Sequence, residues 1–154
     1  MTSHAPLFPE SGAALPLGDG GRYVAYEQKA GRYVRAETVA VTREGAGYDY
    51  VAENGAVTPL TLHPLGGGLF AVQAKAERGG FEYARIRVAR DAVYVEVADC
   101  ARQDPLKLAA LGVARGQGAL PGAKADCALD GVTQARKAFR DLDFGRPTAK
   151  FVRE

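Results

Sequence analysis

The sequence predicts an α+β protein built on a mostly antiparallel sheet of seven to eight strands, with two short helices near the C-terminus. Three observations support this fold class: a run of three alternating strands at the centre of the chain, two hairpin signals before it, and helix-capping signals only after residue 100. Enough curvature would close the sheet into a small β-barrel and remove its edges, whereas less curvature would leave a strongly bent sheet covered by the helices. The pattern favours the barrel.

The centre of the chain alternates between apolar and polar side chains with a period of two. Residues 69–76, 81–90 and 93–99 are separated by short turns and predict a three-stranded antiparallel meander. One face of this meander is apolar and is expected to face the core, with Phe70, Val72, Ala74, Ala84, Ile86, Val88, Val93, Val95 and Val97. The opposite face carries polar side chains and is expected to face water.

The first expected hairpin pairs residues 22–28 with residues 32–42 around Lys29-Ala30-Gly31. In the second of these runs, the apolar residues occupy even-numbered positions up to Ala36 and odd-numbered positions from Val39 onward. Such a change requires an extra residue or a strong bend in the strand, so a β-bulge is expected there. The bulge would add curvature to the sheet.

The second expected hairpin turns at Asn54-Gly55, because type I′ turns need two residues that tolerate positive φ. Its strands are residues 48–53 and 56–63. Pro59 cannot donate a hydrogen bond to a neighbouring strand, so the second strand should be an edge or be broken there. The glycines at 66–68 lack the Lys-Ser/Thr of a phosphate-binding loop and predict a sharp turn before the next strand.

Two helices are expected after the meander. Asp104 followed by Pro105 is typical of an N-cap and a first helical residue, so the first helix covers residues 106–114. Residues 116–122 are a loop by composition, and Asp130 is expected to cap the second helix. The apolar stripe of that helix is expected to share one core with the meander, and the residues concerned are Val132, Ala135, Phe139 and Leu142 with Ile86 and Val95.

The 154 residues fit a single domain. Residues 1–20 contain Pro6, Pro9 and Pro16 without sustained periodicity and predict an extended N-terminal arm. Residues 21–154 then form one antiparallel β-rich domain that includes both helices. The pattern leaves residues 150–153 open between a last strand and a loose tail.

Composition narrows the classes of partner. Hydrophobic residues make up 47% and charged residues 25%, which is typical of a soluble globular protein. The net charge of +2 gives no strong field for nucleic acid or for an anionic membrane surface. No stretch approaches the ~20 apolar residues of a membrane-spanning helix. The expected partner is a small molecule or a protein, and the sequence leaves the oligomeric state open.

The two cysteines, Cys100 and Cys127, are expected to form a disulfide between the end of the meander and the segment before the second helix. Closing a loop of this length would stabilise the fold by about 3–4 kcal/mol. The alternative is two buried free thiols. The Pro-rich start resembles that of a mature exported domain, so a periplasmic or secreted location is expected if a signal peptide was removed, and a cytoplasmic one otherwise.

The chain offers a poor inventory for catalysis. Its only serines, Ser3 and Ser11, lie in the arm, and His63 is the only histidine outside it. A Cys–His pair with His63 remains open only if the cysteines are unpaired. Two distant cysteines and two histidines do not make a zinc site, and no cofactor motif occurs. The sequence therefore predicts a non-enzymatic binding or interaction module, with an enzyme that uses the polar sheet face or the His63 region as the alternative.

One group on the polar sheet face is the candidate ligand-binding site. Paired guanidinium groups flanked by phenols can hold a carboxylate or phosphate, or stack an aromatic ring. The alternative is a solvated sheet face on which an arginine pairs with a glutamate. If the face binds a partner, loss of both arginines should weaken binding and barely change stability, because exposed ion pairs contribute little. The residues of this group are Tyr83, Arg85, Arg87, Tyr94 and Glu96.

Gly21-Arg22-Tyr23, which opens the first expected strand, resembles the Gly-x-Trp start of lipocalin-type, calycin-like barrels. The chain departs from that family in having no tryptophan and in having two helices where the family has one principal helix. The resemblance implies a small barrel that binds a ligand in its interior. The architecture and the expected disulfide also resemble small exported bacterial barrels that inhibit enzymes of a host or competitor.

Overall fold

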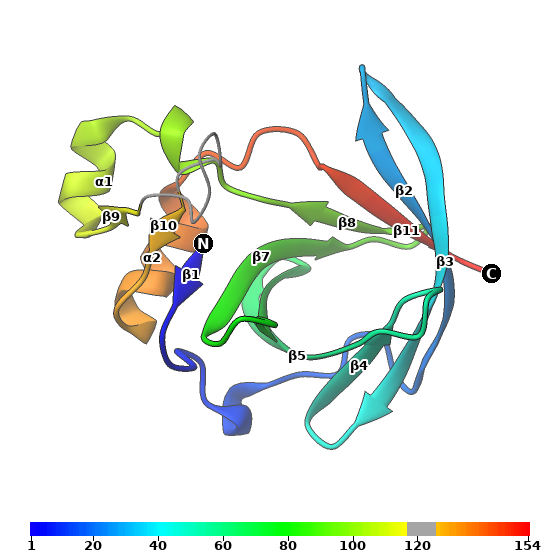
Figure 1. The fold of residues 1–154 in the computed structure, drawn as a ribbon. Helices are drawn as coiled ribbons and strands as arrows, with labels where there is room; N and C mark the ends of the chain where they lie inside the picture. Colours follow the sequence, from blue (N-terminus) through cyan, green and yellow to red (C-terminus); the bar gives the residue numbers. More distant parts are fainter. Residues whose placement is uncertain (117–125) are drawn as a thin grey trace.

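The computed structural model describes residues 1–116 and 126–154. Its centre is a closed antiparallel barrel of eight strands, which confirms the predicted fold class (Figure 1). Each strand pairs with the next along the chain, and the last one closes the barrel by pairing with both β8 and β2. The barrel strands are β2 (Gly20–Lys29), β3 (Arg32–Glu44), β4 (Gly47–Val51), β5 (Val57–Gly66), β6 (Leu69–Lys75), β7 (Phe81–Val88), β8 (Val93–Glu96) and β11 (Ala149–Arg153).

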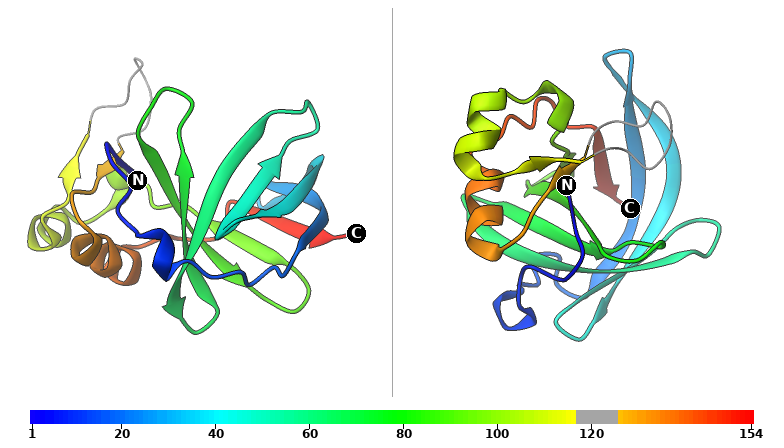
Figure 2. Two further views of the ribbon diagram at one scale, coloured as in Figure 1. Left: turned by 90° about the horizontal axis from the view of Figure 1, so that it is seen from below. Right: turned by 60° about the vertical axis from the view of Figure 1, so that its left-hand side comes forward.

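Between β8 and β11 the chain leaves the barrel and forms a small extension beside it. The N-terminal strand β1 (Thr2–Ser3) pairs with β7 on one side and β10 on the other, so it joins the extension to the barrel. Figure 2 shows both helices on one side of the barrel, where they leave β2, β3 and β11 uncovered. The extension consists of η2 (Cys100–Arg102), α1 (Pro105–Leu111), β9 (Ala114–Arg115), β10 (Cys127–Ala128) and α2 (Val132–Asp141), and a further short helix, η1 (Glu10–Gly12), lies in the arm.

The predicted bulge is present in β3. Ala25 pairs with Glu37 and the next residue of β2, Tyr26, pairs with Arg35, so Ala36 is the extra residue. Residues directly opposite each other on paired strands project from the same face. Because the Ala25 side chain is buried in the barrel, Glu37 also projects from the inner face.

Pro59 and the glycine turn have their predicted roles. Pro59 pairs with Asp49 of β4, and pairing with β6 begins only at Leu60, so Pro59 lies where β5 has a partner on one side. The three glycines at 66–68 have φ values of 97°, 61° and 77°. Such left-handed conformations suit glycine, and they produce the sharp connection between β5 and β6.

The first helix begins as predicted and ends earlier. The Asp104 carboxylate accepts a hydrogen bond from the Leu106 N–H at 2.9 Å. Gly112, with φ 65°, ends the helix in a left-handed conformation, and Ala114 belongs to β9 rather than to the helix. Beyond Gly116, the predicted loop over residues 116–122 lies outside the described residues.

The predicted cap of the second helix is wrong. Gly131, in an extended conformation, precedes α2, and no side chain caps the helix there. The Gln134 side chain instead reaches back and accepts a hydrogen bond from the Asp130 N–H at 2.7 Å. The Asp130 carboxylate therefore makes no capping hydrogen bond to the first turn of α2.

The apolar side chains form two cores, one inside the barrel and one outside it. The inner core contains Tyr23, Ala25, Val39, Tyr48, Leu62, Ile86 and Val93, with Val95 packed against it. The outer core lies between the barrel wall, α2 and the N-terminal arm, and includes Phe8, Ala71, Tyr83, Phe139 and Phe144. The predicted single core of Phe139, Ile86 and Val95 is therefore wrong, because α2 packs on the outer face of the wall. Val97 also departs from prediction, since β8 ends at Glu96 and Val97 is 42% exposed.

The disulfide between Cys100 and Cys127 is formed, with 5.2 Å between the two Cα atoms. It joins η2, which follows β8, to β10. The bond thereby links the segment directly after β8 to the segment before α2 within the extension, and the alternative of two free thiols is excluded. A disulfide of this kind fits a secreted or periplasmic protein.

Candidate functional site

An apolar cavity of about 180 Å³ lies inside the barrel. Among the described residues, none with a charged side chain lines it. Several of its inward-pointing side chains, such as Val72, Ala84 and Val95, remain partly accessible because the interior is not packed solid. The lining residues are Leu17, Tyr23, Val41, Tyr50, Leu60, Leu62, Val72, Ala84, Ile86, Val93, Val95 and Phe151.

The N-terminal arm crosses the barrel beside this cavity. The Tyr48 hydroxyl accepts a hydrogen bond from the Leu17 N–H at 3.0 Å and donates one to the Gly18 carbonyl at 3.1 Å. Burial raises the pKa of Tyr48, so its hydroxyl stays protonated and able to donate. A second hollow of about 350 Å³ adjoins the cavity between the arm and the β7–β8 turn, and the two share Leu17 and Phe151 among their lining residues.

A carboxylate, that of Glu37, accepts a hydrogen bond from Tyr50, one of the residues that line the apolar cavity. The Tyr50 hydroxyl donates a hydrogen bond to Glu37 Oε1 at 3.3 Å, and the Glu53 N–H donates one to Glu37 Oε2 at 3.0 Å. Burial and the neighbouring Glu37 charge raise the pKa of Tyr50 to about 12. Tyr50 is therefore neutral at physiological pH and acts as a donor to Glu37. The sequence analysis missed this pair, although the parity change at Ala36 marked the place where β3 could turn Glu37 inward.

Three of the five predicted site residues are largely buried, which contradicts the expected solvated face. Tyr83 and Glu96 are 3% and 7% exposed. Arg85 Nε donates to Glu96 Oε2 at 2.6 Å, and Arg85 Nη1 donates to the Phe139 carbonyl at 2.9 Å. The Arg85 guanidinium also lies 3.9 Å from the centre of the Phe144 ring. The structure thus brings Arg85 and Glu96 together as a buried link between the barrel and α2.

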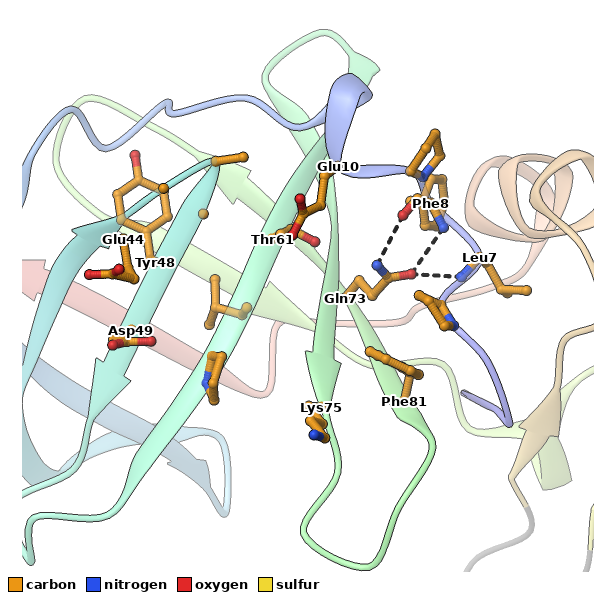
Figure 3. A pocket seen from close by; sticks show the side chains of 17 residues that line it. Leu7, Phe8, Glu10, Glu44, Tyr48, Asp49, Thr61, Gln73, Lys75 and Phe81 are labelled. Atoms are coloured by element: carbon orange, nitrogen blue, oxygen red, sulfur yellow. Dashed lines mark hydrogen bonds between the residues drawn. The ribbon is translucent and has the colours of Figure 1, made fainter.

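The N-terminal arm also covers this part of the outer face. Gln73 Oε1 accepts hydrogen bonds from the Leu7 and Phe8 N–H groups at 2.8 and 3.0 Å, and Gln73 Nε2 donates to the Phe8 carbonyl at 3.1 Å (Figure 3). The Tyr83 hydroxyl donates to Gln73 Oε1 at 3.1 Å. Phe8 is 2% exposed and packs against Tyr83 and Phe139. The only sequence signal for this docking was a lone aromatic residue between the prolines of the arm.

The other two predicted site residues, Arg87 and Tyr94, lie away from this buried link. Arg87 is exposed and Tyr94 is half-buried, and the guanidinium lies 4.6 Å from the centre of the Tyr94 ring. Strand register places them in one row of directly paired residues across five strands. This row alternates cations and phenols in the order Arg87, Tyr94, Lys150, Tyr26 and Arg35.

His63 lies in β5 and is fully buried under the arm. Its ring stacks on Phe8 with 4.8 Å between ring centres, and its Nε2 lies 2.8 Å from the Thr61 hydroxyl oxygen. Burial lowers the pKa of His63, and the nearby Arg136 charge acts in the same direction, against a backbone interaction with Gly12 that raises it. With Phe8 over its ring and both cysteines in the disulfide, the Cys–His pair that was left open is not formed.

A surface groove of about 780 Å³ runs between the arm and strands β4 to β6 (Figure 3). Glu10, Glu44, Asp49 and Lys75 line it together with apolar and small side chains. Within the described part of the chain, none of these four charges forms an ion pair. Its mixed charges contrast with the uniformly apolar cavity inside the barrel.

Among residues 1–116 and 126–154, no group of three or more His, Cys, Asp or Glu side chains could hold a metal ion. Over the same residues, the helices are all too short or too polar to cross a membrane. Comparisons with models of protein families, with curated proteins and with solved structures found no match. What the protein can bind therefore has to follow from its own side chains.

Proposed function

We propose that the protein is a binding module that holds a small apolar molecule inside its barrel. The observation that carries this proposal is the cavity of about 180 Å³ with an entirely apolar lining. Moving an apolar ligand from water into such a space is favourable, and an apolar cavity of about 150 Å³ can hold benzene. A ligand with one ring or a short chain matches this size.

Two further features support a ligand-binding barrel outside the cytoplasm. Gly21-Arg22-Tyr23, near the start of β2, resembles the Gly-x-Trp motif with which lipocalin barrels begin, and Tyr23 lines the cavity. The Cys100–Cys127 disulfide fits an exported protein. Together they favour a lipocalin-like carrier or sensor of small molecules in the periplasm or the medium.

Toluene is expected to bind in the cavity and raise the midpoint of thermal unfolding. A ligand present at ten times its Kd stabilises the folded state by about 1.4 kcal/mol, which corresponds to roughly 3–6 °C for a chain of this size. Thermal unfolding followed by circular dichroism, with and without toluene in sealed cells, measures the shift.

Filling the cavity should remove this shift. Ala84→Phe and, separately, Val95→Phe place a ring in the lumen, whereas Ala40→Phe adds the same ring to the outward-facing side of β3. We expect toluene to stabilise the wild type and the Ala40 variant but neither lumen variant. No shift in the wild type, or an equal shift in a folded lumen variant, would contradict the proposal.

A second candidate function rests on the row of Arg87, Tyr94, Lys150, Tyr26 and Arg35. The Lys150 ammonium lies 5.3 Å from the centre of the Tyr26 ring and 4.6 Å from that of Tyr33. None of the three cations of the row pairs with a carboxylate in the described part of the chain. Since the row follows the curve of the barrel across five strands, it suits a flexible anionic chain better than a flat membrane.

Arg87→Ala combined with Lys150→Ala is expected to elute from immobilised heparin at a lower salt concentration than the wild type, because fewer counterions are released on binding. Lys137→Ala combined with Arg140→Ala removes the same net charge from the exposed side of α2 and is the matched control. If both double variants elute at an equally lowered salt concentration, binding depends only on the net charge, and a specific role of the row is excluded.

A further inference from the structure

We infer that the ligand of the barrel cavity carries a positively charged amine beside its apolar body, and that Glu37 is the partner of this amine. The inference rests on the proposed function, because it concerns the same cavity. It adds the chemical class of the ligand, which the apolar lining alone does not specify.

The position of Glu37 follows from the bulge in β3. Past Ala36, the register places Glu37 opposite Ala25 on the inner face. Tyr50, which lines the cavity, lies between the apolar interior and the carboxylate, since its ring packs against Phe151 and its hydroxyl donates to Glu37 Oε1. The carboxylate thus lies one hydrogen bond beyond the apolar wall, where the polar end of a ligand would emerge.

In the part of the chain that the structure describes, the Glu37 carboxylate has no cationic partner. Within the described residues, no Lys or Arg nitrogen lies within 4.0 Å of its carboxylate. Two cations of β2 and β3 have other partners, since Lys29 pairs with Glu27 at 3.3 Å and Arg35 donates to the Thr38 hydroxyl at 2.9 Å. The two hydrogen bonds that Glu37 accepts come from neutral donors, the Tyr50 hydroxyl and the Glu53 N–H.

An ammonium group of a ligand would supply a positively charged partner for Glu37. It donates up to three hydrogen bonds and carries the opposite charge, so it can share Glu37 Oε1 and the Tyr50 oxygen while its apolar body fills the cavity. An anionic ligand would place its charge beside Glu37 and be repelled. Ligands of the same shape should therefore bind with different affinities according to the charge of their head groups.

Benzylamine, benzyl alcohol and benzoate share one ring and differ in head group, so their Kd values measured by NMR titration test the inference. We expect benzylamine to bind at least tenfold more tightly than benzyl alcohol, and benzoate to bind most weakly. Glu37→Gln should abolish the preference for benzylamine and leave toluene binding unchanged. In this variant the side-chain oxygen can accept from the Glu53 N–H while the new amide NH2 donates to the Tyr50 oxygen, so the fold should be retained.

Glu27→Gln is the matched control, because it removes one negative charge from a neighbouring carboxylate that is already paired with Lys29. Its preference for benzylamine should equal that of the wild type. If toluene binds but benzylamine binds no better than benzyl alcohol, the inference is overturned and the apolar cavity stands. If neither toluene nor benzylamine binds, the proposed function fails as well. If both glutamine variants lose the preference for benzylamine equally, the preference comes from the overall charge of the protein, and the proposed role of Glu37 is overturned.

Discussion

Arg85→Ala is expected to lower the free energy of unfolding by about 3–5 kcal/mol, because it leaves Glu96 as a buried charge without its partner. The side chains of Arg85 and Glu96 are only 17% and 10% exposed, and their closest nitrogen and oxygen are 2.6 Å apart. The substitution also removes a donor to the Phe139 carbonyl and a cation from the face of Phe144. Urea unfolding followed by circular dichroism measures the loss.

Arg87→Ala is the internal control on the same strand. Arg87 is exposed and has no carboxylate partner in the described part of the chain, so its loss should cost about 0–1 kcal/mol. Combining Arg85→Met with Glu96→Leu should recover much of the stability lost in the single variant, since no unpaired charge is then buried. A loss below about 1 kcal/mol in Arg85→Ala would show that this ion pair does not hold α2 against the barrel.

Phe139→Ala is expected to cost about 3–5 kcal/mol, because it deletes a buried aromatic ring and leaves a cavity in the outer core. Phe139 is 1% exposed and packs against the rings of Phe8, Tyr83 and Phe144. Since Phe8 anchors the N-terminal arm in the same core, hydrogen exchange at the Leu7 and Phe8 amides should also become faster. Urea unfolding and exchange measured by NMR give the two readouts.

Leu106→Ala provides the comparison for a helical apolar residue outside the core. Leu106 is 80% exposed in α1, so its truncation should change stability by no more than about 0.5 kcal/mol. A change below about 1 kcal/mol in Phe139→Ala would show that α2 does not dock on the barrel wall. Unchanged exchange at Leu7 and Phe8 would show that the arm docks independently of α2.

The barrel could be predicted because strand signals are local. The alternation of residues 69–99 and the parity change at Ala36 each depend on a few neighbouring side chains, and the observed strands follow them. The signal at Asn54-Gly55 also placed a hairpin turn correctly between β4 and β5, but the predicted type I′ geometry is wrong, because Gly55 has φ 86° and Asn54 does not have positive φ. The prediction of which meander side chains face inward was also correct through Val95. The register there is strongly specified, since a slip of one residue would turn every side chain to the opposite face. The disulfide was expected from the two cysteines and is present.

The candidate site was harder to predict because burial depends on which element covers a face. Alternation separated Arg85, Glu96 and Tyr83 from the lumen but could not show that α2 and Phe8 would cover them, since those contacts join residues far apart in the chain. The two faces of the barrel wall therefore each acquired a core, and only Arg87 and Tyr94 of the predicted group stayed at the surface.

By itself, the sequence determined seven of the eight barrel strands, where they turn and which parity faces inward, because these properties follow from backbone sterics and the period of two. The tertiary structure alone decided that the interior would keep an apolar cavity, that β3 would bring Glu37 to the Tyr50 hydroxyl, and that the polar outer face would become a second core. These outcomes depend on barrel closure by β11 and on the docking of α2 and the arm, which sum many weak contacts between distant segments.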